Sequence, residues 1–281
     1  MIAYLCVSFA VESASLMNLC LKAIVDNFDS LVTKCDDCAE PKLTWRLPCP
    51  DYAIPSPMAD MILKRLSDRR LLKQEHLALF SKQYVDLQSL SLRDFPYSPS
   101  LIPVLHGIDL NDFISAFSER TVEALHTLNV RGMCIEEETK LCAMDALGQF
   151  QNLSHLDISR TNLDSQCLNV LVKSLKRLAY LDISETEVVD ITCGEQSLRQ
   201  MLLTILELKE LRTLEIANFK HHFDQLIEPG VLPHLKHLEM GGNPLRFTLR
   251  DIELLRGENV VMISLTMTLM VCVLFYTLSS T

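Results

Sequence analysis

The chain has 281 residues, a net charge of -10 at pH 7 and a hydrophobic content of 48%. This length leaves room for one extended domain plus a small terminal module. The negative charge repels phosphate backbones and anionic membrane surfaces, so nucleic acid is not expected as a partner.

The N-terminal part begins with an apolar stretch, residues 1–14, which lacks the basic start of a secretory signal. The next segment reads SLMNLCLKAI and places Leu16, Cys20 and Ile24 on one face of a helix. Such a stripe fits a hydrophobic groove on a partner. The alternative interpretation is ordinary packing into the protein's own core.

A proline-containing element follows. Ile54, Pro55 and Met58 fit the spacing apolar-Pro-x-x-apolar, and the apolar stripe continues to Leu66 at helical intervals. Together with the first helix, this stretch predicts a small helical module over residues 15–75.

The pattern L-x-x-L-x-L then recurs, and its copies begin at Leu87, Leu125, Leu153, Leu178, Leu211 and Leu235. The last two apolar residues of each copy are two apart, which indicates a short strand with one apolar face. Helical stripes fall between copies, at residues 110–117, 168–175 and 198–208. The sequence therefore predicts an α/β fold over residues 80–255: an irregular leucine-rich-repeat solenoid with parallel strands inside and helices outside. A globular α/β domain with incidental leucines is the alternative.

The residue between the two inward positions of each strand should face outward. In the last four copies it is acidic, at Asp157, Asp182, Glu215 and Glu239. Strands lie about 4.8 Å apart, so these charges repel one another and we expect water to screen them. One hypothesis is that the concave face binds a Lys- or Arg-containing segment; the other is an ordinary solvated surface.

Ten cysteines are dispersed along the chain. Positions such as Cys20, Cys134, Cys142 and Cys167 suggest reduced, buried thiols rather than a disulfide framework. The nearest approach to a metal motif, around residues 35–49, lacks a full tetrahedral ligand set. No metal or cofactor is therefore expected.

The last segment, residues 260–281, carries no charge. About 20 apolar residues suffice to cross a bilayer. The segment is either a membrane tail anchor or a gene-model artefact, and a membrane is expected as a partner only in the first case.

Taken together, SLMNLCLKAIVDNFDSL, IPSPMADMILKRL, LSHLDIS, LAYLDIS and GVLPHLKHLEMGG resemble the Zyg-eleven/Zer-one family, the leucine-rich-repeat substrate receptors of cullin-2 ubiquitin ligases. The resemblance covers roughly residues 15–255. Members of this family continue into armadillo-like repeats that hold N-terminal glycine degrons, a region that we do not expect within this sequence.

The resemblance implies a non-catalytic subunit that joins elongin C, elongin B, cullin-2 and a RING protein to substrate proteins. It implies elongin C binding by Leu16, Cys20 and Ile24, and cullin binding by Ile54, Pro55 and Met58. A cytoplasmic and also nuclear location is expected.

Two other classes of function are compatible with parts of the sequence to different degrees. A membrane-anchored leucine-rich-repeat receptor would use the apolar ends of the chain and the glycosylation-type sequon at Asn152. An enzyme is disfavoured because the sequence has no glycine-rich phosphate loop, nucleophile elbow or acid-base pair outside the repeat surface.

Overall fold

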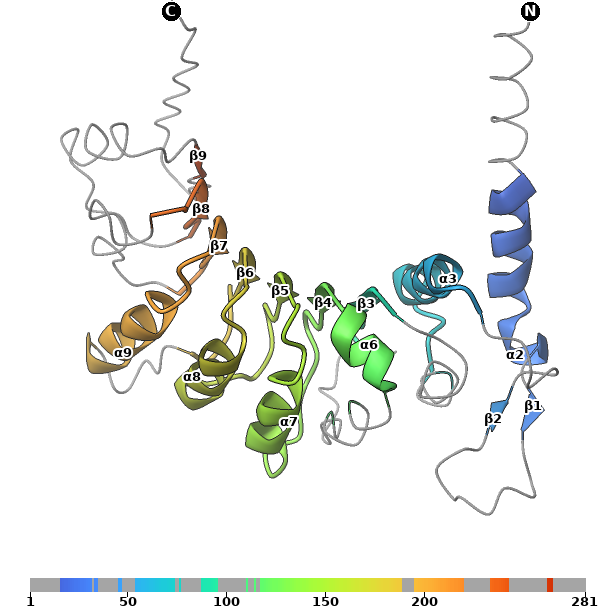
Figure 1. Cartoon of the computed structure of the whole chain (residues 1–281), viewed down its shortest axis with the longest axis horizontal. Coiled ribbons are helices and arrows are strands. Elements are labelled where there is room, and N and C mark those ends of the chain that lie inside the picture. Colours follow the sequence, from blue (N-terminus) through green and yellow to red (C-terminus); the bar gives the residue numbers. More distant parts are fainter. Residues whose placement is uncertain are drawn as a thin grey trace, which may run out of the picture.

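The computed structural model describes residues 16–31, 33–34, 45–46, 54–73, 76, 87–95, 110, 114, 117–188, 195–219, 233–242 and 262–264. Its main feature is a curved, seven-stranded parallel sheet in which sequential strands are neighbours (Figure 1). The strands are β3 (Ser89–Ser91), β4 (Thr127–Asn129), β5 (His155–Asp157), β6 (Tyr180–Asp182), β7 (Thr213–Glu215), β8 (His237–Glu239) and β9 (Met262–Ser264).

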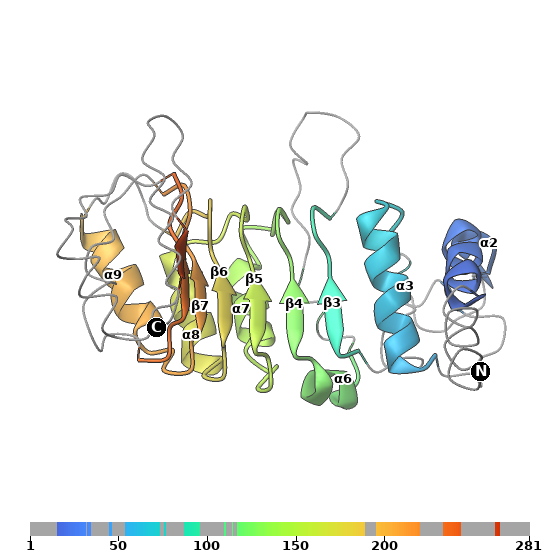
Figure 2. The ribbon, with the colours of Figure 1, turned by 90° about the horizontal axis from the view of Figure 1, so that it is seen from above.

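Helices follow the strands on the convex side of the sheet, as Figures 1 and 2 show. They are α6 (Glu119–Ala124), α7 (Lys140–Leu147), α8 (Ser165–Ser174) and α9 (Glu195–Ile205). The N-terminal part consists of a helix over residues 16–26, α2 (Phe28–Leu31), the two short strands β1 (Thr33–Lys34) and β2 (Trp45–Arg46), and α3 (Ser56–Asp68). The α/β leucine-rich-repeat solenoid predicted from the sequence is therefore confirmed.

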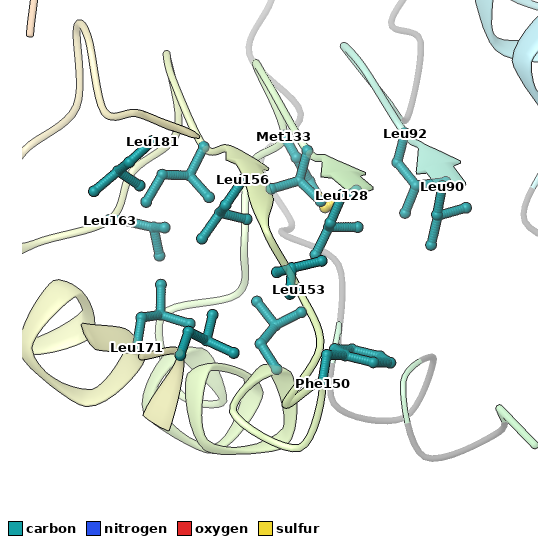
Figure 3. Packing of buried hydrophobic residues seen from close by; sticks show 14 of the residues in the cluster. Leu90, Leu92, Leu128, Met133, Phe150, Leu153, Leu156, Leu163, Leu171 and Leu181 are labelled. Carbon is teal, nitrogen blue, oxygen red and sulfur yellow. The ribbon is translucent and has the colours of Figure 1, made fainter. Parts of the chain in front are cut away.

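The strand positions follow the leucine pattern. All six predicted copies form strands, and the middle residue of each is buried: Leu90, Leu128, Leu156, Leu181, Leu214 and Leu238. These leucines pair in register across the sheet. In Figure 3 Leu128, Leu156 and Leu181 point from the strands toward the helix layer, where Leu171 and Phe150 lie. One ladder of aliphatic side chains thus runs the length of the solenoid.

Two of the helices, α6 and α8, begin at polar caps. The carboxylate of Asp164 accepts from the Cys167 N–H at 2.9 Å at the start of α8, and the Ser118 hydroxyl accepts from the Thr121 N–H at 3.0 Å before α6. Each cap satisfies a backbone donor that has no partner within the helix. The sequence correctly predicted α3, α8 and α9, whereas α6 and α7 were not predicted. The apolar stripe of α7 is hard to see in the sequence because its exposed face also carries an apolar residue, Leu141.

The turn after each of the six strands β3 to β8 contains one residue in the left-handed region. This residue occupies the same repeat position six times: Asp94, Gly132, Arg160, Glu185, Asn218 and Gly242. These turns stack, so a Cβ added at Gly132 would collide with the Asp94 carboxylate, and one at Gly242 with the Asn218 amide. At these two turns glycine avoids both the strain of a left-handed backbone and a close contact with the preceding turn.

We expect Gly132→Ala to destabilise the protein by at least about 1–2 kcal/mol, because alanine strains a left-handed backbone by that amount and its Cβ also meets Asp94. The free energy of unfolding from urea titration measures the change. The double variant Gly132→Ala/Asp94→Ala should recover the part due to the collision and keep the backbone part. Equal stability of the single variant and the wild type would contradict this account.

The expectation for the cysteines needs correction. Cys167 is buried, and burial raises its thiol pKa to about 12, but Cys20, Cys134 and Cys142 are free and exposed. The prediction of buried thiols was therefore wrong at these three positions, because Cys20 and Cys142 lie on the solvent faces of helices and Cys134 lies in the loop after β4. The cysteines near residues 35–49 lie outside the described residues.

The strand β9 was not predicted. It lies in the apolar segment 260–281 and pairs in parallel with β8, with Ile263 opposite Leu238. The rest of that segment lies outside the described residues. Among the residues that the structure does describe, no helix is both long and apolar enough to cross a membrane.

Candidate protein-binding surfaces

The first helix has one inward and one outward apolar face. Leu21 and Val25 are buried, and Phe28 of α2 continues their stripe into the core shared with α3. Leu16, by contrast, is 63% exposed, and Cys20 is also exposed. Leu21 and Val25 therefore make this helix's contact with the core. Leu16 and Cys20, two of the three residues predicted to bind a partner, face solvent instead.

The three residues predicted to bind elongin C, Leu16, Cys20 and Ile24, are not equally exposed. Ile24 is partly buried and packs against the core, so it lies at the rim of the outward face. Sequence reasoning missed Leu19, which is 61% exposed, and Met17, which is also largely exposed. A sequence cue existed for Leu19, which lies on the helix face opposite Leu21 and Val25. Met17, four residues before Leu21, lies on the same stripe as the buried pair and gave no such cue.

The proposed cullin element forms the start of α3. Pro55 is exposed and its carbonyl accepts from the Met58 N–H at 2.8 Å, so it caps the helix. Ile54 and Met58 are half-buried, and Ile54 packs against the core. The element therefore has a structural role, with Pro55 as its most exposed member.

Polar contacts hold the first helix and α3 together. The Arg65 guanidinium donates to the Asn18 side-chain oxygen at 2.6 Å, and Arg69 forms an ion pair with Asp26. These contacts flank the apolar stripe, so the helices of the predicted module pack as one unit.

A buried histidine, His76, links the segment after α3 to α2. His76 Nδ1 accepts from the Lys73 N–H at 3.2 Å, so its Nε2–H donates to the Asp29 carboxylate at 2.7 Å. The Phe28 ring meets the imidazole edge-on at 4.9 Å. The Lys73 ammonium, bonded to the same carboxylate, lowers the pKa of Asp29 although burial opposes it.

Helix α3 also caps the open edge of the sheet. It packs against β3, and Figure 2 shows the two side by side. The Asp60 carboxylate accepts from the N–H groups of Gln88 and Ser89 at 3.3 and 3.2 Å. Burial raises the pKa of Asp60 although both hydrogen bonds lower it. The module and the repeats consequently share one hydrophobic core.

The concave face of the sheet carries the predicted acidic column. Asp157, Asp182, Glu215 and Glu239 pair in register on four adjacent strands. Three of them also hold the following turn: Asp157 accepts from the Ser159 N–H, Asp182 from the Ser184 N–H and Glu239 from the Gly241 N–H, at 3.0, 2.9 and 2.7 Å. The acids thus have a structural role that the sequence analysis did not foresee.

Asp182 contradicts the expectation of a water-screened column, because it is only 2% exposed. Burial raises its pKa to about 6, and the charges of Asp157 and Glu215 act in the same direction against the Ser184 hydrogen bonds. The Arg131 guanidinium, 3.9 Å from the Asp182 carboxylate, partly balances this charge. Only Asp157, Glu215 and Glu239 are open to solvent, each about half-buried.

An aromatic column lies beside the acids. His155 and Tyr180 begin neighbouring strands, and their rings stack with centroids 5.9 Å apart. The Tyr180 hydroxyl donates to the Glu215 carboxylate at 2.9 Å. Burial, followed by this hydrogen bond, raises the pKa of the phenol, which keeps it a donor.

Comparison with known families agrees with this geometry. Residues 101–200 match the family described as Zer-1-like leucine-rich repeats. Residues 101–200 are thus similar to Zer-1-like leucine-rich repeats. Leucine-rich repeats are interaction surfaces built by stacking one unit on the next, which gives the Zer-1-like segment a protein-binding role. No curated protein matches the chain significantly.

Solved structures similar to this chain include two internalins from Listeria monocytogenes. Internalin C2 is 19% identical with a TM-score of 0.39, and the match covers 66% of this chain and 62% of that one. Internalin F is 16% identical with a TM-score of 0.39, covering 75% of this chain and 58% of that one. The match therefore spans less than two thirds of either internalin.

Proposed function

We propose that the protein is a substrate-receptor subunit of a cullin-2 RING ubiquitin ligase. In this proposal Leu16, Cys20 and Ile24 bind elongin C, which carries elongin B, and the start of α3 contacts cullin-2. The repeat face holds the protein to be ubiquitinated, and the chain acts in the cytoplasm and nucleus without catalytic residues of its own.

One observation carries the proposal. The first helix buries Leu21 and Val25 in the protein itself, yet it leaves Leu16, Leu19 and Cys20 facing outward. An amphipathic helix that lays such a face into a hydrophobic groove is a common recognition mode. Pro55 lies exposed at the start of α3, which packs against the same helix.

Co-expression of the full chain with elongin B, elongin C and cullin-2 tests the proposal. Each leucine that becomes buried contributes roughly 1.5–3 kcal/mol. Leu16→Ala/Cys20→Ala should therefore reduce capture on tagged elongin C at least tenfold, because both changes remove apolar contacts.

The matched control is Leu203→Ala, which truncates an equally exposed leucine on α9 and should leave capture unchanged. Circular dichroism should show the same fold for all three proteins, since none of the altered side chains lies in the core. Failure of the folded wild type to bind elongin C, or full binding by the double variant, would disprove the proposal.

The alternative of a membrane-anchored receptor drew support from the glycosylation-type sequon at Asn152. The Asn152 amide donates to the Glu123 carbonyl at 2.8 Å and accepts from Arg177 at 2.6 Å, and thereby joins neighbouring repeats. A glycan would leave this nitrogen a single N–H and would have to fit beside the contact to Glu123. The observed geometry favours the ligase-receptor proposal, and sensitivity to a glycosidase would reverse that preference.

A further inference from the structure

A basic rim runs along the edge of the sheet at which the parallel strands β6, β7 and β8 begin (Figure 2). This strand-start rim has six exposed basic side chains from three adjacent repeats: Lys173, Lys176, Arg177, Lys209, Arg212 and Lys236. Among the described residues of this edge only two acids, Glu207 and Glu210, lie between them. The rim is therefore a local excess of positive charge in a chain whose net charge is -10.

Backbone hydrogen bonds place the repeats of the rim side by side. The Arg212 N–H donates to the Ala179 carbonyl and the Lys236 N–H donates to the Arg212 carbonyl, both at 2.8 Å. Arg212 and Lys236 thus occupy equivalent positions on neighbouring repeats, about 4.8 Å apart in backbone spacing. Within the described part of the chain, neither forms an ion pair with a carboxylate. A bound anion would relieve the repulsion between their charges.

A carboxylate of the chain itself shows what the rim accommodates. The Lys176 ammonium donates to the Glu207 carboxylate at 2.8 Å. This hydrogen bond lowers the pKa of Glu207, and the charges of Lys173 and Lys209 act in the same direction. Three lysines therefore act on one internal carboxylate at the helix side of the rim. The strand side, where Arg212 immediately precedes β7, is open to a carboxylate from outside.

The opposite edge of the sheet differs because its cations are already paired. In the turns after the strands, Arg93 pairs with Asp94 at 3.5 Å and Arg160 pairs with Glu185 at 3.4 Å. Each pair neutralises its own charge. Among the described residues of the repeats, positive charge that is available to a partner is therefore concentrated at the strand-start rim.

The surroundings of the rim favour one class of anion. Glu215 and Glu239 follow Arg212 and Lys236 by three residues, on the concave face of the same repeats. Nucleic acid has a closely spaced row of phosphates, which these carboxylates would repel. A polypeptide segment with a few Asp or Glu residues can place its carboxylates on the rim alone. The charge pattern therefore favours an acidic segment of a protein over nucleic acid.

We infer that the strand-start rim binds an acidic, Asp- or Glu-bearing segment of a protein partner, with Arg212 and Lys236 as its main contacts. The inference rests on the proposed function, in which the repeats hold the protein to be ubiquitinated, and it names the chemical class of the bound segment. Because the basic side chains are exposed, added salt should weaken this binding.

The test uses a fluorescein-labelled peptide of alternating glycine and glutamate, whose binding to the full chain is measured by fluorescence anisotropy at low salt. A peptide with glutamine in place of glutamate has the same shape without the charge. We expect the glutamate peptide to bind at least tenfold more tightly than the glutamine peptide. Arg212→Gln/Lys236→Gln should weaken binding of the glutamate peptide at least fivefold, because it removes both main contacts. Equal binding of the two peptides by the wild type would overturn the inference.

A matched double variant and a second polyanion make the test specific. Arg93→Gln/Arg160→Gln lowers the net charge equally at the opposite edge and should change peptide affinity less than twofold. All four altered side chains are exposed, so circular dichroism should show the wild-type fold for both variants. An oligothymidine with the charge of the glutamate peptide should bind less tightly. Equal weakening by the two double variants, or tighter binding of the oligothymidine, would contradict the inference.

Elongin capture separates this inference from the proposed function. Arg212 and Lys236 lie on the repeats, so their double variant should retain capture on elongin C. Loss of capture by the wild type would remove the ligase proposal, while the peptide measurements would still decide whether the rim binds acidic segments.

Discussion

Leu156→Ala should destabilise the protein by about 2–5 kcal/mol, the range for removing a fully buried leucine. Leu156 is the middle residue of β5 and is 1% exposed, between Leu128 and Leu181 on the adjacent strands. Because each repeat contacts mainly its neighbours, the cavity would weaken the stacking of both adjoining repeats. Urea unfolding followed by circular dichroism measures the loss as a lower midpoint.

Leu141→Ala provides the control for the same truncation. Leu141 lies on α7 with about half of its surface exposed, so its replacement should change the free energy of unfolding by less than about 1 kcal/mol. Similar losses for the two variants would show that the ladder of strand leucines does not hold the solenoid together.

Asp182→Asn should stabilise the protein at neutral pH. Burial raises the pKa of Asp182 to about 6 in the folded state, against about 3.9 in an unfolded chain. The folded state therefore binds the proton more tightly, and ionisation of this group lowers the free energy of unfolding as the pH rises from about 4 to about 6. The difference between these pKa values corresponds to about 3 kcal/mol at neutral pH.

Asparagine keeps the oxygen that accepts from the Ser184 N–H and does not ionise. The variant should match the wild type near pH 4 and exceed its stability by up to about 3 kcal/mol near pH 7. Asp145→Asn, an exposed change on α7, should show no such pH-dependent difference. A constant difference between Asp182→Asn and the wild type from pH 4 to 7 would contradict the assignment.

The sequence was sufficient to predict the repeats because their stabilising contacts follow a simple period. The leucine at the centre of each of the six predicted strands packs the sheet against the helices, and the same leucine makes the repeat recognisable in the sequence. The missed strand β9 has a weaker form of the pattern, with Val260, Ile263 and Leu265 at the same intervals as Leu235, Leu238 and Met240. Replacing leucine with valine and isoleucine was enough to hide it within an apolar segment.

The properties of the binding surfaces were harder to predict because they depend on neighbours that are distant in sequence. The acidic character of the column follows from strand alternation, which the sequence shows. The burial of Asp182 depends on the surrounding strands, and the position of Arg131 depends on the turn after β4. Likewise, the packing of α3 against the first helix decides which face of that helix is buried, and thereby leaves Leu16 and Leu19 outward.

The capping of the sheet edge by α3 has a mechanical consequence. Asp60 fastens this helix to β3, while Arg65 and Arg69 fasten it to the first helix, so it works as a rigid bracket rather than a linker. On the proposed function, a protein on the concave face would be held at one orientation relative to elongin C. Ubiquitin would then reach only those lysines that lie within one sector around the bound protein.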